Sequence, residues 1–386
     1  MTTPSFHSPR LPGFAESFEI AGRKIGGGAP CYVIAEAGSN HDQNLETALA
    51  LVDAAAAAGA DSVKFQTFVA EEIGSNYQSA DTTLPDKFKK YGSLQGLYRH
   101  CALPDDFHEP IAARAAERKI TFFSSAFSER DVDRLVKVGV PTIKIASFEL
   151  VHLPLIRHAA STGLPLIVST GMAGLGDIER ALEAVVSGGG NKVALLHCGS
   201  SYPLNAASAN LAAMETIRRA FGVPVGYSDH TGPDPDAKVP DPTAGLAVPT
   251  AAAALGAAVL EKHFTLRRSN PDGTPREDWP DHSFALEPNE LTAMVRLMRG
   301  AEQAIGSPRK SRATEEEPLV RLGRRSIFVT RALRAGDKLT PDSVKVLRPG
   351  IGIDPQFLPL LLGRPVTRAM PADTPLSWDD VLEALK

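Results

Sequence analysis

Three ionisable residues, Glu261, Lys262 and His263, stand together in the segment VLEKHF (259–264), directly after a run of small apolar residues. Burying one unpaired charge is costly, so three at the end of a predicted strand need partners. Alternate residues of a strand share a face, so Glu261 and His263 point to one side and Lys262 to the other. His230 ends the preceding predicted strand in the same way. We expect the two imidazoles to meet and to supply half of the ligands of a divalent metal ion.

The competing interpretation for each histidine is an ordinary hydrogen bond in the core. Two histidines at adjacent strand ends favour the metal only modestly. Glu261 is expected to orient a ligand or to support the site from behind, and Lys262 to face a structural partner.

Two lysines occupy apolar strand contexts, Lys64 in DSVKFQT and Lys144 in TIKIAS. Lysine is almost never fully buried unless it is paired. A phosphate group would pair both, with hydrogen bonds from Ser147 and Ser169 at the ends of the fourth and fifth predicted strands. Separate structural ion pairs with acidic residues are the alternative, and the polar strand ends favour the anion site.

Glu36 ends the first predicted strand, in IAEAGSNH. A carboxylate at this place is a candidate acid, base or substrate-orienting group. A salt bridge to one of the two lysines is the competing interpretation. Asn40 and His41 follow it and either bind substrate or cap the helix that begins near Leu45.

The elements that must position these residues follow a regular pattern. Short apolar runs alternate with amphipathic helical patterns from about residue 30 to 305, which predicts eight β-then-α units and a (β/α)8 barrel. The main rival, a doubly wound open sheet, is weakened by the missing GxGxxG after the first strand. The predicted strands are 31–38, 61–67, 120–125, 142–147, 164–170, 192–198, 223–230 and 257–264.

The composition of the chain changes after Gly306, where polar and charged residues follow. We expect a barrel domain over 1–306, a polar linker over 307–323 and a small β-rich domain over 324–386. A Pro/Asp-rich loop at 233–243 precedes the eighth strand, and it is either functional or a solvated insertion.

Composition excludes several classes of function. The net charge of −4 gives no basic footprint for nucleic acid. Three widely spaced cysteines argue against disulfides and a zinc site. The N-terminus lacks a signal-peptide core, and no apolar run reaches the length of a membrane span, so we expect a cytoplasmic protein without a membrane partner.

Eight motifs occur in the order typical of one family. IAEAGSNH, ADSVKFQTF, IKIASFE, IVSTGMA, LLHCGSSYP, VGYSDHT, LGAAVLEKHF and RPGIGI resemble those of the sialic acid (nonulosonic acid) synthase family, over about residues 15–386. The family has a (β/α)8 barrel followed by a small antifreeze-like (SAF) domain. It condenses phosphoenolpyruvate with an N-acyl hexosamine aldehyde and water, releases phosphate, and requires a divalent metal, usually Mn²⁺, with Mg²⁺ or Co²⁺ as alternatives.

The resemblance also implies roles for individual residues. His230 and His263 would hold the metal, and Glu36 would act near the reacting centre. Those implied to bind phosphoenolpyruvate are Lys64, Ser125, Lys144, Ser147, Ser169, Ser200 and Ser228. Those implied to bind the sugar are Gln66, Tyr202, Asp281 and Arg348, the last from a homodimer partner whose SAF domain is swapped over the site.

The motifs leave open to which subtype of the family, defined by its sugar acceptor, the chain is most similar. CGSSYP has Ser200 where many N-acetylneuraminate synthases have Asn, which is closer to pseudaminate or legionaminate synthases. The loops 233–243 and 269–283 resemble no subtype, so the acceptor is either N-acetylmannosamine or a 2,4-diacetamido-trideoxyhexose. Glu316, within TEEEP in the linker, falls near a family glutamate.

Two rival functions remain open from sequence. A metal-dependent barrel aldolase or isomerase would keep the metal but would not need two phosphate-binding lysines. A non-catalytic sugar-binding homologue would not depend on His230.

Overall fold

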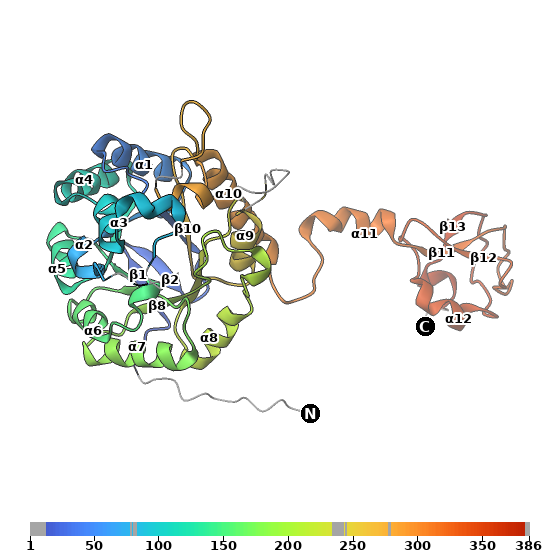
Figure 1. Ribbon diagram of the computed structural model, residues 1–386. Coiled ribbons are helices and arrows are strands. Elements are labelled where there is room, and N and C mark those ends of the chain that lie inside the picture. Colours follow the sequence, from blue (N-terminus) through green and yellow to red (C-terminus); the bar gives the residue numbers. More distant parts are fainter. Residues whose placement is uncertain are drawn as a thin grey trace. The chain divides into compact units, whose positions relative to one another are not determined.

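The computed structural model of the chain describes residues 13–77, 79, 83–233, 243, 245–276 and 279–382. It consists of two compact units, Met1–Gly306 and Ser307–Lys386 (Figure 1), and each is described by itself.

The first unit is built around a closed barrel of eight parallel strands, in the order β10-β3-β4-β5-β6-β7-β8-β9. All eight predicted strands are present, which confirms the predicted fold class. Their bounds are β3 Tyr32–Gly38, β4 Ser62–Thr67, β5 Thr121–Ala126, β6 Ile143–Ile145, β7 Leu166–Ser169, β8 Val193–Cys198, β9 Val225–Asp229 and β10 Val259–His263.

Helices cover the outside of the barrel (Figure 1). Their apolar faces pack on the strands, and local caps fix where they begin. The Asn44 side chain caps the first helix and Ser128 forms a capping box on α5, so Asn40 and His41 do not cap the first helix as one alternative held. The helices are α1 Leu45–Ala57, α4 His108–Arg118, α5 Glu129–Val138, α6 Leu153–Ser161, α7 Leu175–Ser187, α8 Ala213–Phe221, α9 Ala247–Ala254 and α10 Pro288–Ile305.

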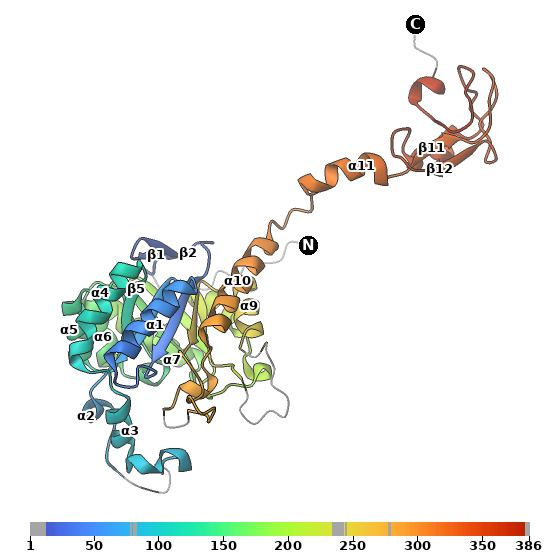
Figure 2. The same ribbon diagram turned by 90° about the horizontal axis from the view of Figure 1, so that it is seen from above.

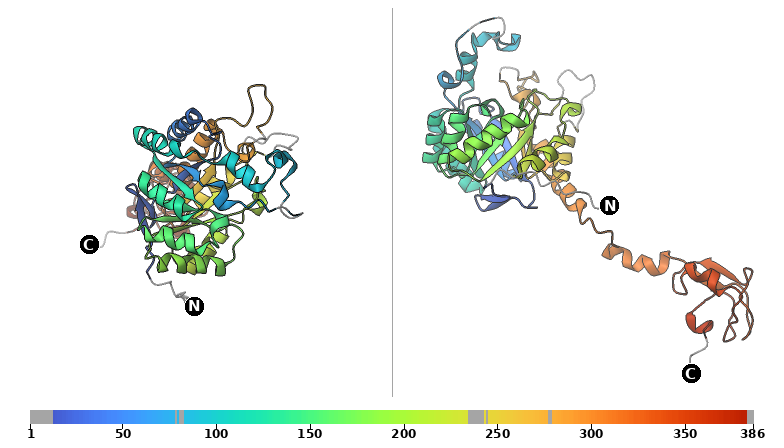
Figure 3. Two further views of the ribbon diagram at one scale, coloured as in Figure 1. Left: turned by 60° about the vertical axis from the view of Figure 1, so that its left-hand side comes forward. Right: turned by 90° about the horizontal axis from the view of Figure 1, so that it is seen from below.

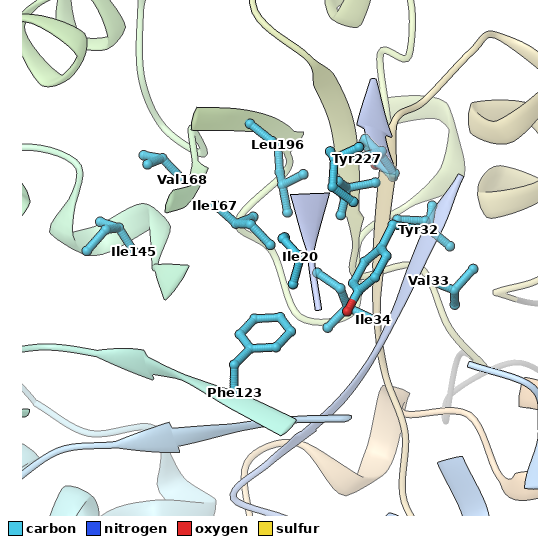
Figure 4. Packing of buried hydrophobic residues seen from close by; sticks show 14 of the residues in the cluster. Ile20, Tyr32, Val33, Ile34, Phe123, Ile145, Ile167, Val168, Leu196 and Tyr227 are labelled. Atoms are coloured by element: carbon cyan, nitrogen blue, oxygen red, sulfur yellow. The ribbon is translucent and has the colours of Figure 1, made fainter. Parts of the chain in front are cut away.

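An antiparallel hairpin that we did not expect, β1 Ser17–Ile20 and β2 Arg23–Gly26, closes the N-terminal end of the barrel. Ile20 is fully buried and lies among Ile34, Phe123 and Ile167 of the barrel (Figure 4). The hairpin therefore supplies core side chains to the floor of the barrel.

The segment between β4 and β5 forms a separate lobe, which we call the roof and which the structure describes over residues 70–77, 79 and 83–103. It contains α2 Ala70–Ile73, a 3-10 turn Asp86–Tyr91 and α3 Leu94–Cys101. Phe68, Phe88, Leu97, Cys101 and Trp279 form a hydrophobic cluster of their own here. Figure 2 and the right panel of Figure 3 show the roof at the end of the barrel opposite to β1 and β2.

The second unit is small and β-rich. It contains α11 Glu317–Gly323, α12 Leu358–Leu361 and a sheet of β11 Ser326–Val329, β12 Val344–Leu347 and β13 Thr374–Pro375, in the order β12-β11-β13. The segment expected to be a linker thus includes a helix. Glu316 accepts a hydrogen bond from the backbone of Ala313, and Arg348 is exposed and donates to the Gly323 carbonyl.

Two loops singled out in the sequence are only partly described. Residues 234–242 of the first loop and 277–278 of the second lie outside the described residues. Across the part of the chain that is described, no helix combines the length and apolar character needed to cross a bilayer.

Candidate active site

Strand alternation builds the interior of the barrel in layers. Apolar residues such as Ile34, Phe123 and Ile167 fill the lower part (Figure 4). The next inward positions, nearer the C-terminal ends, carry charged and hydroxyl groups instead. These groups line a cavity of about 440 Å³ that opens toward the roof. Active sites of this fold lie at the same end.

Two buried lysines and two buried glutamates form an alternating charge cluster in this cavity. The Lys64 ammonium lies 2.6 Å from Glu36 and 3.8 Å from Glu261, and the Lys144 ammonium lies 3.6 Å from Glu261. Both lysines are only 2% exposed. The ion pairs that we weighed as the alternative therefore exist, and they bring both lysines to one place.

The two glutamates differ in their protonation. Burial raises the pKa of Glu36 to about 7, although the nearby Lys64 opposes this rise. Burial also acts to raise the pKa of Glu261, but the charges of Lys144 and Lys64 outweigh it and hold this pKa below its usual range. Glu261 is thus the anionic partner of the lysines, and Glu36 can gain or lose a proton near neutral pH.

Hydroxyl groups surround the two ammonium groups. Lys64 donates to Ser125 over 3.0 Å and Lys144 to Ser169 over 2.7 Å, while Ser228 donates to Glu261 over 3.2 Å. Two buried cations with several hydroxyls in one cavity are a suitable binding site for a tetrahedral oxyanion.

Ser147 and Ser200 lie at one side of this cluster. The Ser147 hydroxyl accepts from the backbone N–H of Gly171 over 3.1 Å and lines the cavity. A Cβ atom at Gly171 would lie 2.2 Å from the Ser200 oxygen and 2.8 Å from that of Ser147, so only glycine fits. Ser200 itself is not among the described residues that line the cavity, and its hydroxyl faces Cys198 at 4.0 Å.

His230 and His263 meet at the mouth of the barrel, with ring centroids 5.4 Å apart. His230 Nδ1 is 2.7 Å from the Gly199 carbonyl, which assigns the proton to Nδ1 and leaves Nε2 as a lone-pair donor. Burial lowers the pKa of both residues, that of His263 most strongly, so both imidazoles are neutral.

These two imidazoles fit a divalent ion. Neutral imidazole is the form that binds metals, and a carbonyl behind Nδ1 is a common support for such a ligand. His263 Nδ1 is buried without a hydrogen-bond partner and lies 3.7 Å from Asp281. Within the described residues, no group of three or more His, Cys, Asp or Glu side chains forms a complete metal site. Any ion would need further ligands from substrate or water.

Asp281 comes from the loop after β10 and is held against the first β–α loop. Its carboxylate accepts from the backbone and hydroxyl of Ser39, over 3.4 and 3.3 Å. Gly38 has φ +52°, and a Cβ there would lie 2.6 Å from the Asp281 carboxylate. Gln66 donates to Glu36 over 2.8 Å, and Tyr202 packs on His230 with ring centroids 4.3 Å apart. The predicted sugar-contacting residues of the barrel therefore all border the two histidines or Glu36.

Sequence reasoning missed Glu149, which follows β6 in the motif IASFE and lines the same cavity. Burial raises its pKa to about 7, against the opposing effect of Lys144. The signal that could have found it is a glutamate placed two residues after Ser147, just beyond a strand end that already carried site residues.

The outer half of the cavity differs from the charged inner half in the polarity of its lining. Its wall toward the roof is largely apolar and aromatic, with Lys87 as the only lysine or arginine among the described residues there. This wall consists of Phe68, Phe88, Leu97, Tyr98, Phe127 and Phe148. The cavity can therefore hold an anion at its inner end and a partly apolar molecule at its outer end.

A larger hollow, about 910 Å³, lies at the opposite end of the barrel beside the β1–β2 hairpin. Its arginines already have partners, because Arg23 and Arg299 both bind Asp61, at 2.8 and 2.9 Å. We therefore place the candidate active site in the smaller cavity.

Comparisons with known proteins find a matching family and relatives over most of the chain. Residues 51–310 match the NeuB family, and residues 324–382 match the SAF domain. The chain is 36% identical over 373 residues to the N,N'-diacetyllegionaminic acid synthase of Legionella pneumophila, covering 93% of this chain and 98% of that protein. It is 32% identical over 358 residues to the pseudaminic acid synthase of Helicobacter pylori, covering 92% and 99%. It is also similar to the solved N-acetylneuraminic acid synthetase of Leptospira borgpetersenii in complex with citrate, with a TM-score of 0.65 and 29% identity over 80% of this chain and 96% of that chain.

Proposed function

Because this chain belongs to the NeuB family and carries a SAF domain, we propose that it is a nonulosonic acid synthase, a transferase that forms a C–C bond. The proposed substrates are phosphoenolpyruvate, an N-acyl amino sugar aldehyde and water. The products are a nine-carbon 2-keto-3-deoxy acid and phosphate. The observation that carries the proposal is the pair of buried lysines, Lys64 and Lys144, next to two neutral histidines in one barrel cavity.

The inner end of the cavity would bind the phosphate of phosphoenolpyruvate. Lys64 and Lys144 would supply two ammonium groups. The serines proposed to donate further hydrogen bonds are Ser125, Ser147, Ser169 and Ser228. In a dry site such contacts remain strong as charge shifts onto the departing phosphate.

The bond changes that these groups must support are balanced. C3 of phosphoenolpyruvate forms a bond to the aldehyde carbon, and the aldehyde oxygen takes up a proton. Water adds at C2 and loses one proton, which balances the proton taken up by the aldehyde oxygen. The C2–O bond to phosphate then breaks while the new C2 hydroxyl gives up its proton, so that a ketone and phosphate are left. Glu36 and Glu149, whose pKa values burial raises to about 7, are the proposed proton-carrying groups.

We propose that His230 and His263 hold a divalent ion, Mn²⁺ first, with Mg²⁺ or Co²⁺ as alternatives. Such an ion supplies Lewis-acid polarisation of a carbonyl. The support for this proposal is the neutral state of both imidazoles and the Gly199 carbonyl behind His230.

The sugar would occupy the outer half of the cavity, with Gln66, Tyr202 and Asp281 as polar contacts. A phosphorylated sugar would need cations there, and the described lining offers Lys87 alone. The apolar wall favours an unphosphorylated acceptor with deoxy or additional acyl groups, such as a 2,4-diacetamido-trideoxyhexose, over N-acetylmannosamine.

We also propose that the protein works as a homodimer in which Arg348 of each SAF domain reaches the partner's sugar site. The support is the family match and the exposure of Arg348.

The decisive experiment is phosphate release from phosphoenolpyruvate with Mn²⁺, across N-acetylmannosamine and the 2,4-diacetamido-trideoxyhexoses, with and without chelator. We expect release with one class of sugar and its loss on chelation. Release without any sugar dependence would contradict the proposal. Turnover of a sugar without phosphoenolpyruvate would also contradict it and would favour another barrel aldolase or isomerase. Sugar binding without release would favour a non-catalytic homologue.

A further inference from the structure

A buried ion pair lies directly behind the two histidines, on the outer face of the barrel. Lys262 and Asp229 are partners in the register of β10 and β9. Their Nζ and Oδ2 atoms are 2.5 Å apart, and both side chains are fully buried. Each residue immediately precedes one histidine, His263 after Lys262 and His230 after Asp229.

The same pair also holds the backbone beyond His230. Asp229 accepts from the hydroxyl of Thr231 over 2.7 Å and from its backbone N–H over 3.2 Å, and Lys262 donates to the Thr231 carbonyl. The residues on both sides of His230 are thereby tied to the neighbouring strand. Gly245 has φ +77° and lets its backbone approach this cluster, because a Cβ there would lie 3.1 Å from the Lys262 ammonium.

Stability alone gives little reason for this pair. Desolvating two charges offsets most of their attraction, and well-packed apolar residues often stabilise a core equally well. The other outward positions of these strands are indeed apolar or aromatic, namely Val225, Tyr227, Leu260 and, just beyond β10, Phe264. An ion pair with hydrogen bonds differs from such packing because it fixes direction and register.

We propose that Asp229 and Lys262 are positioning residues, which fix the imidazoles of His230 and His263 relative to each other for one divalent ion. The inference rests on the proposed function, since it assigns a role toward the proposed metal. Neither residue touches the cavity, so both act through the histidine next to them in the chain.

The test uses the double variant Asp229→Asn with Lys262→Met, which removes both charges and leaves no orphan ion. The readouts are the Kd for Mn²⁺ by calorimetry, the absorption spectrum of bound Co²⁺, and the thermal midpoint. We expect a folded protein with a Kd weakened by about tenfold or more, as for other groups that orient metal ligands, and an altered Co²⁺ spectrum.

A matched control separates positioning from general loss of stability. Leu182→Ala removes a buried side chain of α7, away from the histidine strands, and should lower the thermal midpoint without changing the Kd. If the double variant does not fold, Asp229→Asn with Lys262→Gln, which also removes both charges but keeps a polar group at each position, is judged by the same measurements.

The outcomes are distinct. A Kd within about twofold of the wild-type value overturns the positioning role and leaves the proposed function intact. A wild-type protein that binds no Mn²⁺ at millimolar concentration overturns the metal proposal and this inference together.

Discussion

The Lys144 ammonium lies 3.6 Å from the Glu261 carboxylate, and both side chains are almost fully buried. Without a phosphate, Glu261 is the main counter-charge of Lys144 and a second one of Lys64. An incoming phosphate would therefore meet lysines that are already held in place, and part of the reorganisation cost of binding is avoided. The same glutamate limits affinity, because its charge repels the anion that the lysines attract.

The first prediction concerns Lys144→Met. It removes a cation but keeps most of the side-chain volume, and it should raise the KM for phosphoenolpyruvate by about 30- to 1000-fold, since losing one partner of a buried, hydrogen-bonded charge pair costs about 2 to 4 kcal/mol. The matched control is Lys192→Met, an exposed lysine just before β8. Equal KM values for both variants, from initial rates of phosphate release, would contradict the assignment of the phosphate site.

The second prediction concerns His263→Ala. Substituting a residue that supports a metal ligand weakens metal binding by about 10- to 100-fold. Because His263 would itself be a ligand, this variant should weaken Mn²⁺ binding by more than that and should abolish phosphate release. The protein should remain folded, because the variant leaves no buried charge behind. His158→Ala, at a half-exposed histidine paired with Asp133 on the outer surface, should change neither measurement. Unchanged calorimetric Mn²⁺ affinity in His263→Ala would exclude this residue as a ligand.

The third prediction is a pH dependence of stability from Glu149. Burial raises its pKa from 4.5 to about 7, so between these values the folded protein binds more protons than the unfolded chain. The free energy of unfolding contributed by Glu149 therefore falls as pH rises through this window and levels off above about pH 7. Glu149→Gln does not titrate at this position. Its free energy of unfolding in urea should therefore rise relative to that of the wild type from about pH 5 to about pH 8. The exposed Glu183→Gln serves as control, and a pH-independent difference for Glu149→Gln would refute the prediction.

The fourth prediction tests the swapped dimer with two separately inactive variants. His230→Ala damages the barrel site, and Arg348→Ala damages the contribution of the SAF domain. If Arg348 acts on the partner's barrel, random mixing of subunits creates mixed dimers with one intact site, and about a quarter of wild-type activity should return. Mixtures that stay inactive after subunit exchange, shown by differently tagged chains, would place Arg348 at the barrel of its own chain. An active Arg348→Ala variant would place Arg348 outside the site.

Much of the barrel could be predicted because its signal is repeated. Eight apolar runs of similar spacing each end in polar residues, and strand alternation then assigns Lys64, Lys144, His230 and His263 to the interior. The functional residues at the strand ends could therefore be predicted from each strand separately.

What the sequence did not reveal depends on contacts between distant segments. The β1–β2 hairpin is too short to stand out, and its role becomes clear only when Ile20 is found inside the barrel floor. The partner of Lys262 could not be named, because the register of β9 and β10 decides that it is Asp229. Glu149 was overlooked because its raised pKa comes from burial, which no local pattern reports.

The roof has a hydrophobic cluster that is separate from that of the barrel, yet it forms the wall against which the sugar would rest. Substitutions in this small cluster can reshape the acceptor end while the barrel core and the phosphate end keep their packing. In an ancestral enzyme with two separate clusters, substitutions in the roof can admit new sugars while the fold and the reaction are preserved. Relatives that differ in their sugar acceptor should accordingly differ first in the residues of the roof.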